Sequence, residues 1–240
     1  MDAVLLQRLA QITEEERELL QGRGVDRALY ASGRAFEVDA AKMLGKGKLM
    51  SIRPHTRFAP FPRHSHNYVE IMYMCRGKTV HRIDGDALVT LEAGELLFLN
   101  RHASHAIQRA DAGDIAVNFI VLPQFFDEAF NMAGMDNVLS RFLLGELYTG
   151  GAAVSYLHFR VREVLPVQNL VENMVWTLVN RQPGARRINQ VTMGLLLLQL
   201  MHYTECIDMS RNGSIRSPMV EAALREIEEN YRAASLTDVA

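Results

Sequence analysis

The stretch HSHNYVEIMYMCRG, residues 64–77, decides the fold. Its core, Tyr68–Cys75, is a compact apolar run rich in β-forming residues, which predicts a buried strand. His64 and His66 are two residues apart and Glu70 follows four residues later, so a strand would place all three on one face. Imidazole and carboxylate groups in this mix suit Zn, Ni, Fe or Mn. Spacing alone favours a metal-free polar pocket, in which these groups hydrogen-bond one another.

The strand signal extends on both sides of this stretch, from about residue 48 to residue 122. Asp84-Gly85-Asp86 is a turn signal between two of the runs, and His105 follows a third run as a further potential ligand. Regularly spaced short strands predict an antiparallel sandwich or barrel. We expect these strands at Thr79–Ile83, Leu88–Leu91, Leu96–Leu99 and Ile115–Leu122.

Helical patterns flank the strand region. Residues 3–20 have amphipathic spacing, and Thr13 with Glu16 forms a capping box that divides them into two short helices. Glycines then punctuate a loop-rich region up to residue 47. After Pro123 we expect short helices at Phe125–Met132 and Val138–Leu147, a strand at Ala153–Phe159, and long helices at Glu163–Arg181 and Arg186–Cys206.

The end of the chain carries two further helix starts. Ser217-Pro218 begins one helix, and Ser235-Leu236-Thr237-Asp238 is a second capping box. Ala240 falls within the first turn after that box, so we expect this chain to be a piece of a longer protein.

Composition places the 240 residues in the globular class, with 48% hydrophobic and 22% charged residues. This balance excludes general disorder and a collagen-like repeat. Lys and Arg number 26 against 28 Asp and Glu, a net charge of -2. Binding to a phosphate backbone needs a local basic excess, so this chain alone is a poor candidate for a nucleic-acid binder.

Nothing in the sequence points to export or to a membrane. Cys75 and Cys206 cannot form a disulfide framework, and we expect both as buried, reduced thiols. The N-terminus becomes acidic at residues 14–16, unlike a signal peptide. The longest apolar run, Val191–Met201, is shorter than the ~20 residues that span a bilayer. A reducing cytoplasm is the expected location.

At its histidines the sequence resembles the cupin superfamily. The first cupin motif is His-x-His, three or four residues, Glu, six residues, Gly. His64, His66, Glu70 and Gly77 match this spacing, while Phe58 stands where the family has a glycine.

The second cupin motif is matched in part. Gly94 and His105 are present, whereas Asn100, His102 and Arg109 replace the Pro, Gly and Asn of the family. The resemblance implies one divalent metal, Zn, Ni, Fe or Mn, and four ligands for it: His64, His66, Glu70 and His105.

The layout of the whole chain resembles an AraC-type transcriptional regulator. The resemblance rests on a His-x-His cupin, two long helices, and a helix that ends in Glu228-Glu229-Asn230-Tyr231. It implies an α+β fold, in which an antiparallel β-sandwich or barrel of cupin (jelly-roll) type is followed by a helical dimerisation region. It divides the chain into an N-terminal helical extension, a cupin-like effector-binding domain, paired dimerisation helices and the start of a truncated helix-turn-helix domain, at residues 1–47, 48–160, 161–210 and 217–240.

Effector-binding candidates are inward or polar side chains of the strands. Most inward positions, such as Met72, are ordinarily core. For His81 and Arg82 a solvated strand face is favoured, and Asn118 fits a satisfied core amide equally well. The candidates are Tyr68, Met72, His81, His102 and Asn118.

The second long helix carries a candidate dimer seam. The alternative is packing against the sheet and the Glu163–Arg181 helix, and the all-round apolar character favours both. Trp176 is expected in the core. The seam residues are Ile188, Val191, Leu195, Leu198 and His202.

Arg53, Arg57 and Arg63 form a sparse basic cluster ahead of the histidine pair. We expect solvated loop charge there. In regulators of the AraC type, the segment ahead of the cupin can instead act as an effector-responsive arm.

The leading hypothesis is the sensor part of a transcription regulator, with a small-molecule effector such as a sugar, a homodimer, and DNA bound only through a C-terminal domain absent from this chain. No catalytic residue is expected. The alternative is a metal-dependent cupin enzyme, a dioxygenase or sugar isomerase, whose four ligands leave coordination positions open. A non-catalytic binding protein is a third reading that nothing favours.

Overall fold

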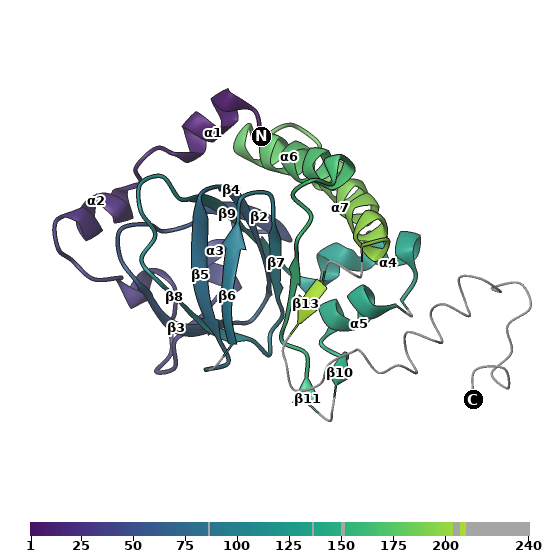
Figure 1. Cartoon of the computed structure of the whole chain (residues 1–240), viewed down its shortest axis with the longest axis horizontal. Coiled ribbons are helices and arrows are strands. Elements are labelled where there is room, and N and C mark those ends of the chain that lie inside the picture. The colour runs from purple at the N-terminus through teal and green to yellow at the C-terminus, as the bar shows by residue number, and fades with distance from the viewer. Residues whose placement is uncertain (86, 136, 150–151, 204–206, 210–240) are drawn as a thin grey trace, which may run out of the picture.

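The computed structural model describes residues 1–85, 87–135, 137–149, 152–203 and 207–209 (Figure 1). Two sheets pack against each other. One has the order β1 (Glu37–Val38), β3 (Phe61–His66), β8 (Ser104–Ile107), β5 (Lys78–Ile83) and β6 (Ala87–Glu92). The other has the order β13 (Ile207–Met209), β12 (Tyr156–Phe159), β7 (Leu96–Leu99), β4 (Val69–Arg76), β9 (Ile115–Val121) and β2 (Met50–Pro54). A short pair, β10 (Tyr148–Thr149) and β11 (Ala152–Ala153), stands apart.

The strand pairings in both sheets are antiparallel except for β1 with β3. The predicted α+β class with an antiparallel sandwich is therefore confirmed. The predicted strands form within two residues of their expected bounds, except that the strand expected at Ala153–Phe159 begins only at Tyr156. Within the predicted strand region, β2, β3 and β8 were not delimited by the sequence. Apolar residues are few in β3 and β8, and β2 and β3 contain Pro54 and Pro62.

β4 is buried on both of its faces, and this divides the core into two layers. Met72 and Met74 point between the sheets, where they pack with Leu97 and Leu99 of β7 and with side chains of β5 and β6. The alternate residues of β4 pack on the helices instead, in a cluster that includes Ile71, Tyr73 and Phe98. A strand buried on two sides explains the uninterrupted apolar run in the sequence.

Helices cover the outer face of the six-stranded sheet (Figure 1). Thr13 and Glu16 form the predicted capping box, since each side chain accepts a hydrogen bond from the other residue's backbone N–H. The helical elements are α1 (Ala3–Leu9), α2 (Glu14–Leu20), η1 (Arg27–Leu29), α3 (Ala40–Met43), η2 (Pro123–Phe126), α4 (Asp127–Ala133), α5 (Val138–Leu144), α6 (Leu165–Val179) and α7 (Ala185–Met201).

The long helix α7 packs on α4 and α6 more than on the sheet. Gly194 leaves room for α4, because a Cβ there would lie 2.6 Å from the Met132 Sδ. Trp176 was expected in the core, and this is wrong: its side chain is 48% exposed on α6. A single aromatic at a helical position gives no local signal of which way it faces.

Some predictions fall outside the described residues. These are Cys206 and the helix starts of the 217–240 segment, so the four-part division of the chain stays a prediction. Cys75 is a free, half-buried thiol. Within the described ranges, no helix is long and apolar enough to cross a membrane.

Gly77, the glycine of the first motif, has a local steric reason. Its φ is +79°, and a Cβ there would lie 2.2 Å from the Asp114 Oδ1. We predict that Gly77→Ala lowers the free energy of unfolding by about 2 kcal/mol or more. Gly113→Ala is the matched control, because a Cβ there meets nothing within 4 Å. It should change stability by less than about 0.5 kcal/mol. Urea unfolding of both variants is the measurement, and equal losses would contradict the steric explanation.

Candidate functional site

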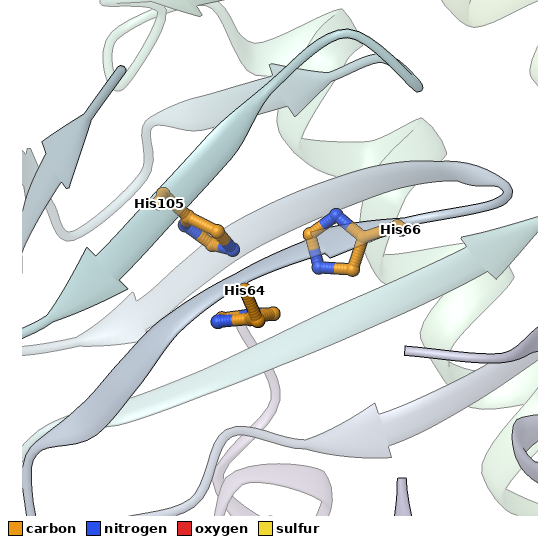
Figure 2. A group of neighbouring side chains, drawn as sticks. All are labelled: His64, His66 and His105. Atoms are coloured by element: carbon orange, nitrogen blue, oxygen red, sulfur yellow. The ribbon is translucent and has the colours of Figure 1, made fainter. Parts of the chain in front are cut away.

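Three histidines from neighbouring strands meet inside the sandwich (Figure 2). His64 and His66 lie on β3, and His105 lies on β8 directly opposite His64. One ring nitrogen from each lies within 4.8 Å of the others, and all three side chains are buried. The alternation of β3 explains the pair, because residues two apart on a strand point to one side.

Glu70 approaches these histidines from the opposite sheet. The sequence predicted that His64, His66 and Glu70 share one face of one strand, and this is wrong. The chain leaves β3 after His66 and crosses to β4, so Glu70 faces the histidines across the interior. Its Oε2 is 3.5 Å from the Nε2 atoms of both His66 and His105. The four predicted metal ligands therefore converge, although from two sheets.

Several polar atoms at this point have no hydrogen-bond partner in the described part of the chain. They are both ring nitrogens of His66, the Nε2 of His105, the Oε2 of Glu70 and the Oδ1 of Asn118. Each buried, unpaired polar atom costs about 1–3 kcal/mol, so native proteins rarely leave several together. Imidazole nitrogens and a carboxylate oxygen aimed at one another match the donor set of a divalent transition metal. The residues present thus fit a metal ion.

Burial sets the charge state of the site. It lowers the pKa of His64 to about 4, and it lowers the pKa values of His66 and His105 well below the usual range. All three rings are therefore neutral at pH 7, the form that binds metals. Burial also raises the pKa of Glu70 to about 7, although a hydrogen bond from Asn118 at 2.9 Å acts in the opposite direction.

The site opens into a cavity of about 40 Å³. A buried water needs about 10–15 Å³ by this measure, so the cavity holds about three waters. Tyr68 and Asn118 line it, as predicted. Sequence reasoning missed other lining residues, and of these only His55 belongs to the cluster of histidines visible in the sequence. The missed polar residues are Tyr30, Arg53, His55 and Thr56.

Three effector-binding candidates do not line this cavity. Met72 is fully buried in the core between the sheets. His81 was favoured as solvent-facing, which is wrong: it is fully buried, stacks on His105 with a 7° interplanar angle, and its Nε2 lies 2.9 Å from the Thr79 Oγ1. His102 is exposed, with its Nε2 3.2 Å from the Gly145 carbonyl oxygen.

The N-terminal extension forms one wall of the cavity. Tyr30, Val38 and Met43 all come from it. Arg53 of β2 donates to the Tyr30 hydroxyl at 2.8 Å and forms an ion pair with Glu15 of α2. The extension is therefore bound to the sandwich next to the histidines.

A second, buried ion pair holds the same extension. Arg57 is 4% exposed, so the expectation of solvated charge is wrong for this residue. Its Nε donates to the Glu16 Oε1 at 2.7 Å, and a terminal nitrogen donates to the Oε2 at 2.9 Å. Arg63, by contrast, is exposed and bonds the Ser104 hydroxyl. Ion pairs between distant segments leave no local pattern in a sequence.

The candidate dimer residues follow one face of α7. Ile188, Val191 and Leu195 are 41%, 37% and 44% exposed, which is high for large apolar side chains. Leu198 is half-buried and His202 is exposed. This face is therefore unpacked within the described part of the chain.

The comparisons with known proteins agree with this geometry. The family model described as "AraC-like ligand binding domain" matches residues 51–130, which hold all four converging side chains. This segment, a third of the chain, is therefore similar to the ligand-binding domains of AraC-like proteins. No curated protein sequence matches the chain significantly.

The solved structures that a search finds similar to this chain include regulators and a cupin. An apo ToxT variant from Vibrio cholerae is 10% identical, with 80% of this chain and 69% of that chain covered and a TM-score of 0.49. The AraC-like transcriptional activator CuxR is 12% identical, with coverage of 72% and 55% and a TM-score of 0.34. A cupin protein from Bacteroides fragilis is 28% identical, with coverage of 30% and 64% and a TM-score of 0.26. The chain spans about two thirds of the length of the ToxT chains.

The buried ion pair predicts how firmly the extension is held. Glu16→Ala leaves Arg57 buried without its carboxylate, so we predict a loss of about 3–5 kcal/mol in the free energy of unfolding. Glu18→Ala is the control, since Glu18 pairs with Arg23 at the exposed surface of the same helix. Such a pair contributes about 0–1 kcal/mol. Urea unfolding at pH 7 compares the two.

The same pair predicts a pH dependence. Burial alone would raise the pKa of Glu16, but hydrogen bonds from Arg57 and from the Thr13 amide outweigh it and lower that pKa below 4.5. Its stabilisation is therefore present above pH 4.5 and is lost as the pH falls through the folded-state pKa. The wild type should lose this part of its stability in acid, whereas Glu16→Ala should not. Identical acid profiles would contradict the assignment.

Proposed function

We propose that this chain is the effector-sensing and dimerisation part of a cytoplasmic AraC-type transcription regulator, and that it is not an enzyme. One observation carries the proposal: the unpaired, buried histidine and carboxylate atoms that line the cavity all belong to the segment that matches the family's ligand-binding domain. Unpaired polar atoms in a cavity are the usual mark of a missing ligand.

The effector is a small polar molecule, such as a sugar or related metabolite. The cavity of about 40 Å³ is too small for a monosaccharide as it stands. For a monosaccharide to enter, part of the cavity wall must move. The part that belongs to a separate segment is the N-terminal extension, which contributes Tyr30, Val38 and Met43. An effector that binds the open state better shifts the equilibrium of the extension toward that state. The size of the shift is set by the difference between its affinities for the two states.

A divalent metal, Zn, Ni, Fe or Mn, is part of this proposal. His64, His66, His105 and Glu70 would hold it, and it would offer open coordination positions to effector oxygens. Asn118 orients Glu70 by donating to its Oε1, while the carbonyl of Pro62 lies 2.8 Å from the Nδ1 of His64 and fixes that ring.

The proposed output passes through α7 and through a further domain. The exposed apolar face of Ile188, Val191 and Leu195 forms a homodimer seam. DNA is bound by a C-terminal helix-turn-helix domain beyond this chain. Bound effector changes the position of the extension against the sandwich, and the dimer transmits this change.

The second candidate function is a metal-dependent cupin oxygenase or isomerase. The observation in its favour is the ligand set itself, because three histidines and one carboxylate leave coordination positions free for a substrate. Oxygen uptake by the Fe(II)-loaded protein with candidate substrates tests the oxygenase, and conversion of a candidate sugar to its isomer by the metal-loaded protein tests the isomerase.

The metal proposal gives a direct prediction. Calorimetric titration of chelator-treated protein with ZnCl2 and NiCl2 should show one site per chain. His64→Ala and His105→Ala should each weaken it by about tenfold or more, since each removes a ligand. His102→Ala is the matched control, because this histidine is exposed and outside the cavity, and it should bind as the wild type does.

The same samples test sensing. Amide hydrogen exchange over residues 27–44 should change when a monosaccharide from a panel binds to the metal-loaded protein. A monosaccharide that binds without altering exchange in this segment would contradict the proposed role of the extension. Equal metal binding by all three histidine variants would contradict the metal site.

The dimer seam gives the next prediction. Light scattering at micromolar concentration should show a dimer for the wild type and a monomer for Leu195→Lys, which buries a charge in the seam. Leu165→Lys is the control, because Leu165 is 67% exposed at the start of α6, outside the seam. A monomeric wild type, or a monomeric Leu165→Lys variant, would contradict the seam.

A further inference from the structure

A second cavity lies away from the histidines, where the N-terminal helix meets the junction of α6 and α7. Its walls come from α1, from residues 47–54 including β2, and from residues 177–189. Figure 1 shows α1 beside α6, and Arg8 of α1 donates to the Asn180 Oδ1 at 2.6 Å. The volume is about 660 Å³, within the range of about 300–1,000 Å³ of small-molecule sites. We call it the α1–α6 groove.

The charges around the α1–α6 groove have one sign. Arg8, Lys48, Arg181 and Arg186 line it, all with exposed side chains, and no Asp or Glu does. Within the described part of the chain, none of the four forms an ion pair. Four uncompensated cations in a chain of net charge -2 are a local excess, and such a cleft concentrates anions.

The base of the groove is apolar. Leu9, Met50 and Phe125 are 5%, 6% and 1% exposed there, and Ile52 and Leu178 are half-buried beside them. The neutral polar residues Thr177 and Asn189 are bonded to each other at 2.7 Å. A ligand that satisfies both parts needs an acidic head for the cationic rim and an apolar body for the base.

We propose that the α1–α6 groove binds a small amphiphilic anion, in which a carboxylate or phosphate head group is attached to an apolar chain or ring. Arginine suits both head groups, because its guanidinium donates two parallel hydrogen bonds to either. DNA would use the cations but leave the apolar base uncovered, so a small molecule fits the whole groove better. The groove shares only Pro54 with the lining of the histidine cavity, and the proposal does not rest on the proposed effector.

Arg181 offers a clean way to remove one cation. Its φ is +51°, in the left-handed region that favours glycine. Arg181→Gly therefore removes the charge while its backbone adopts the same conformation with less strain. Lost binding with unchanged or higher stability would separate a ligand contact from a structural role.

The experiment is calorimetric titration of the full chain in low salt with four probes that share one tail: octanoate, octyl phosphate, octanol and octyltrimethylammonium. At least one anion should bind at one site, and octanol should bind at least about tenfold more weakly. Arg181→Gly and Arg186→Gln should each weaken anion binding by about fivefold or more. Arg187→Gln is the control, since this neighbour pairs with Glu128 and lies outside the groove.

Binding of only one of the two anions supports the proposal, whereas four other outcomes would overturn it. Saturable binding of neither anion below its micelle-forming concentration would mean that the groove is not an anion site. Equal binding of octanol would leave only an apolar contact, and an equal effect of Arg187→Gln would indicate diffuse charge. Duplex DNA that binds through Arg181 and Arg186, while both anions fail, would make this face a nucleic-acid contact. If only one anion binds, the preferred head group is identified.

Discussion

The main constraint on the structure is the burial of polar atoms that face one another without hydrogen bonds, because the rest of the fold must compensate for their cost. His66, His105 and Glu70 contribute such atoms at the centre of the sandwich. Each costs free energy on folding, so the arrangement persists only because the apolar core on both faces of β4 outweighs it. If stability alone mattered, apolar side chains would fill this space. They do so two and four residues after Glu70 on the same strand, at Met72 and Met74.

Much of this arrangement could be predicted from the sequence, because it is determined by residues that are close together in the chain. The apolar run of β4, the turn before β6 and the two motif glycines follow from strand patterning and left-handed backbone conformations. Phe58 illustrates a departure: it stands at the family's glycine position and keeps a positive φ of 73°. Phe58 thus adopts a left-handed conformation that glycine adopts without strain.

The remaining features depend on contacts between distant segments. The crossing of the chain between His66 and Val69 moves Glu70 to the other sheet, and counting residues along one strand cannot detect it. From the sequence, Arg57 was expected to be a solvated loop charge, because its partner Glu16 lies far earlier in the chain. His81 was expected on a solvated strand face, because its stacking partner, His105, lies on another strand. The kinds of side chain in the site were predictable from the sequence, whereas their positions relative to one another were not.

β2 connects the two cavities physically. Pro54 lines both, Arg53 faces the histidine cavity, and Met50 and Ile52 lie at the base of the α1–α6 groove. The N-terminal extension also contributes to both, through Tyr30 to one and Arg8 to the other. A ligand that moves this extension at one cavity changes the walls of the other. Linkage then requires the effect to be reciprocal, so each ligand would alter the affinity for the second by the same factor.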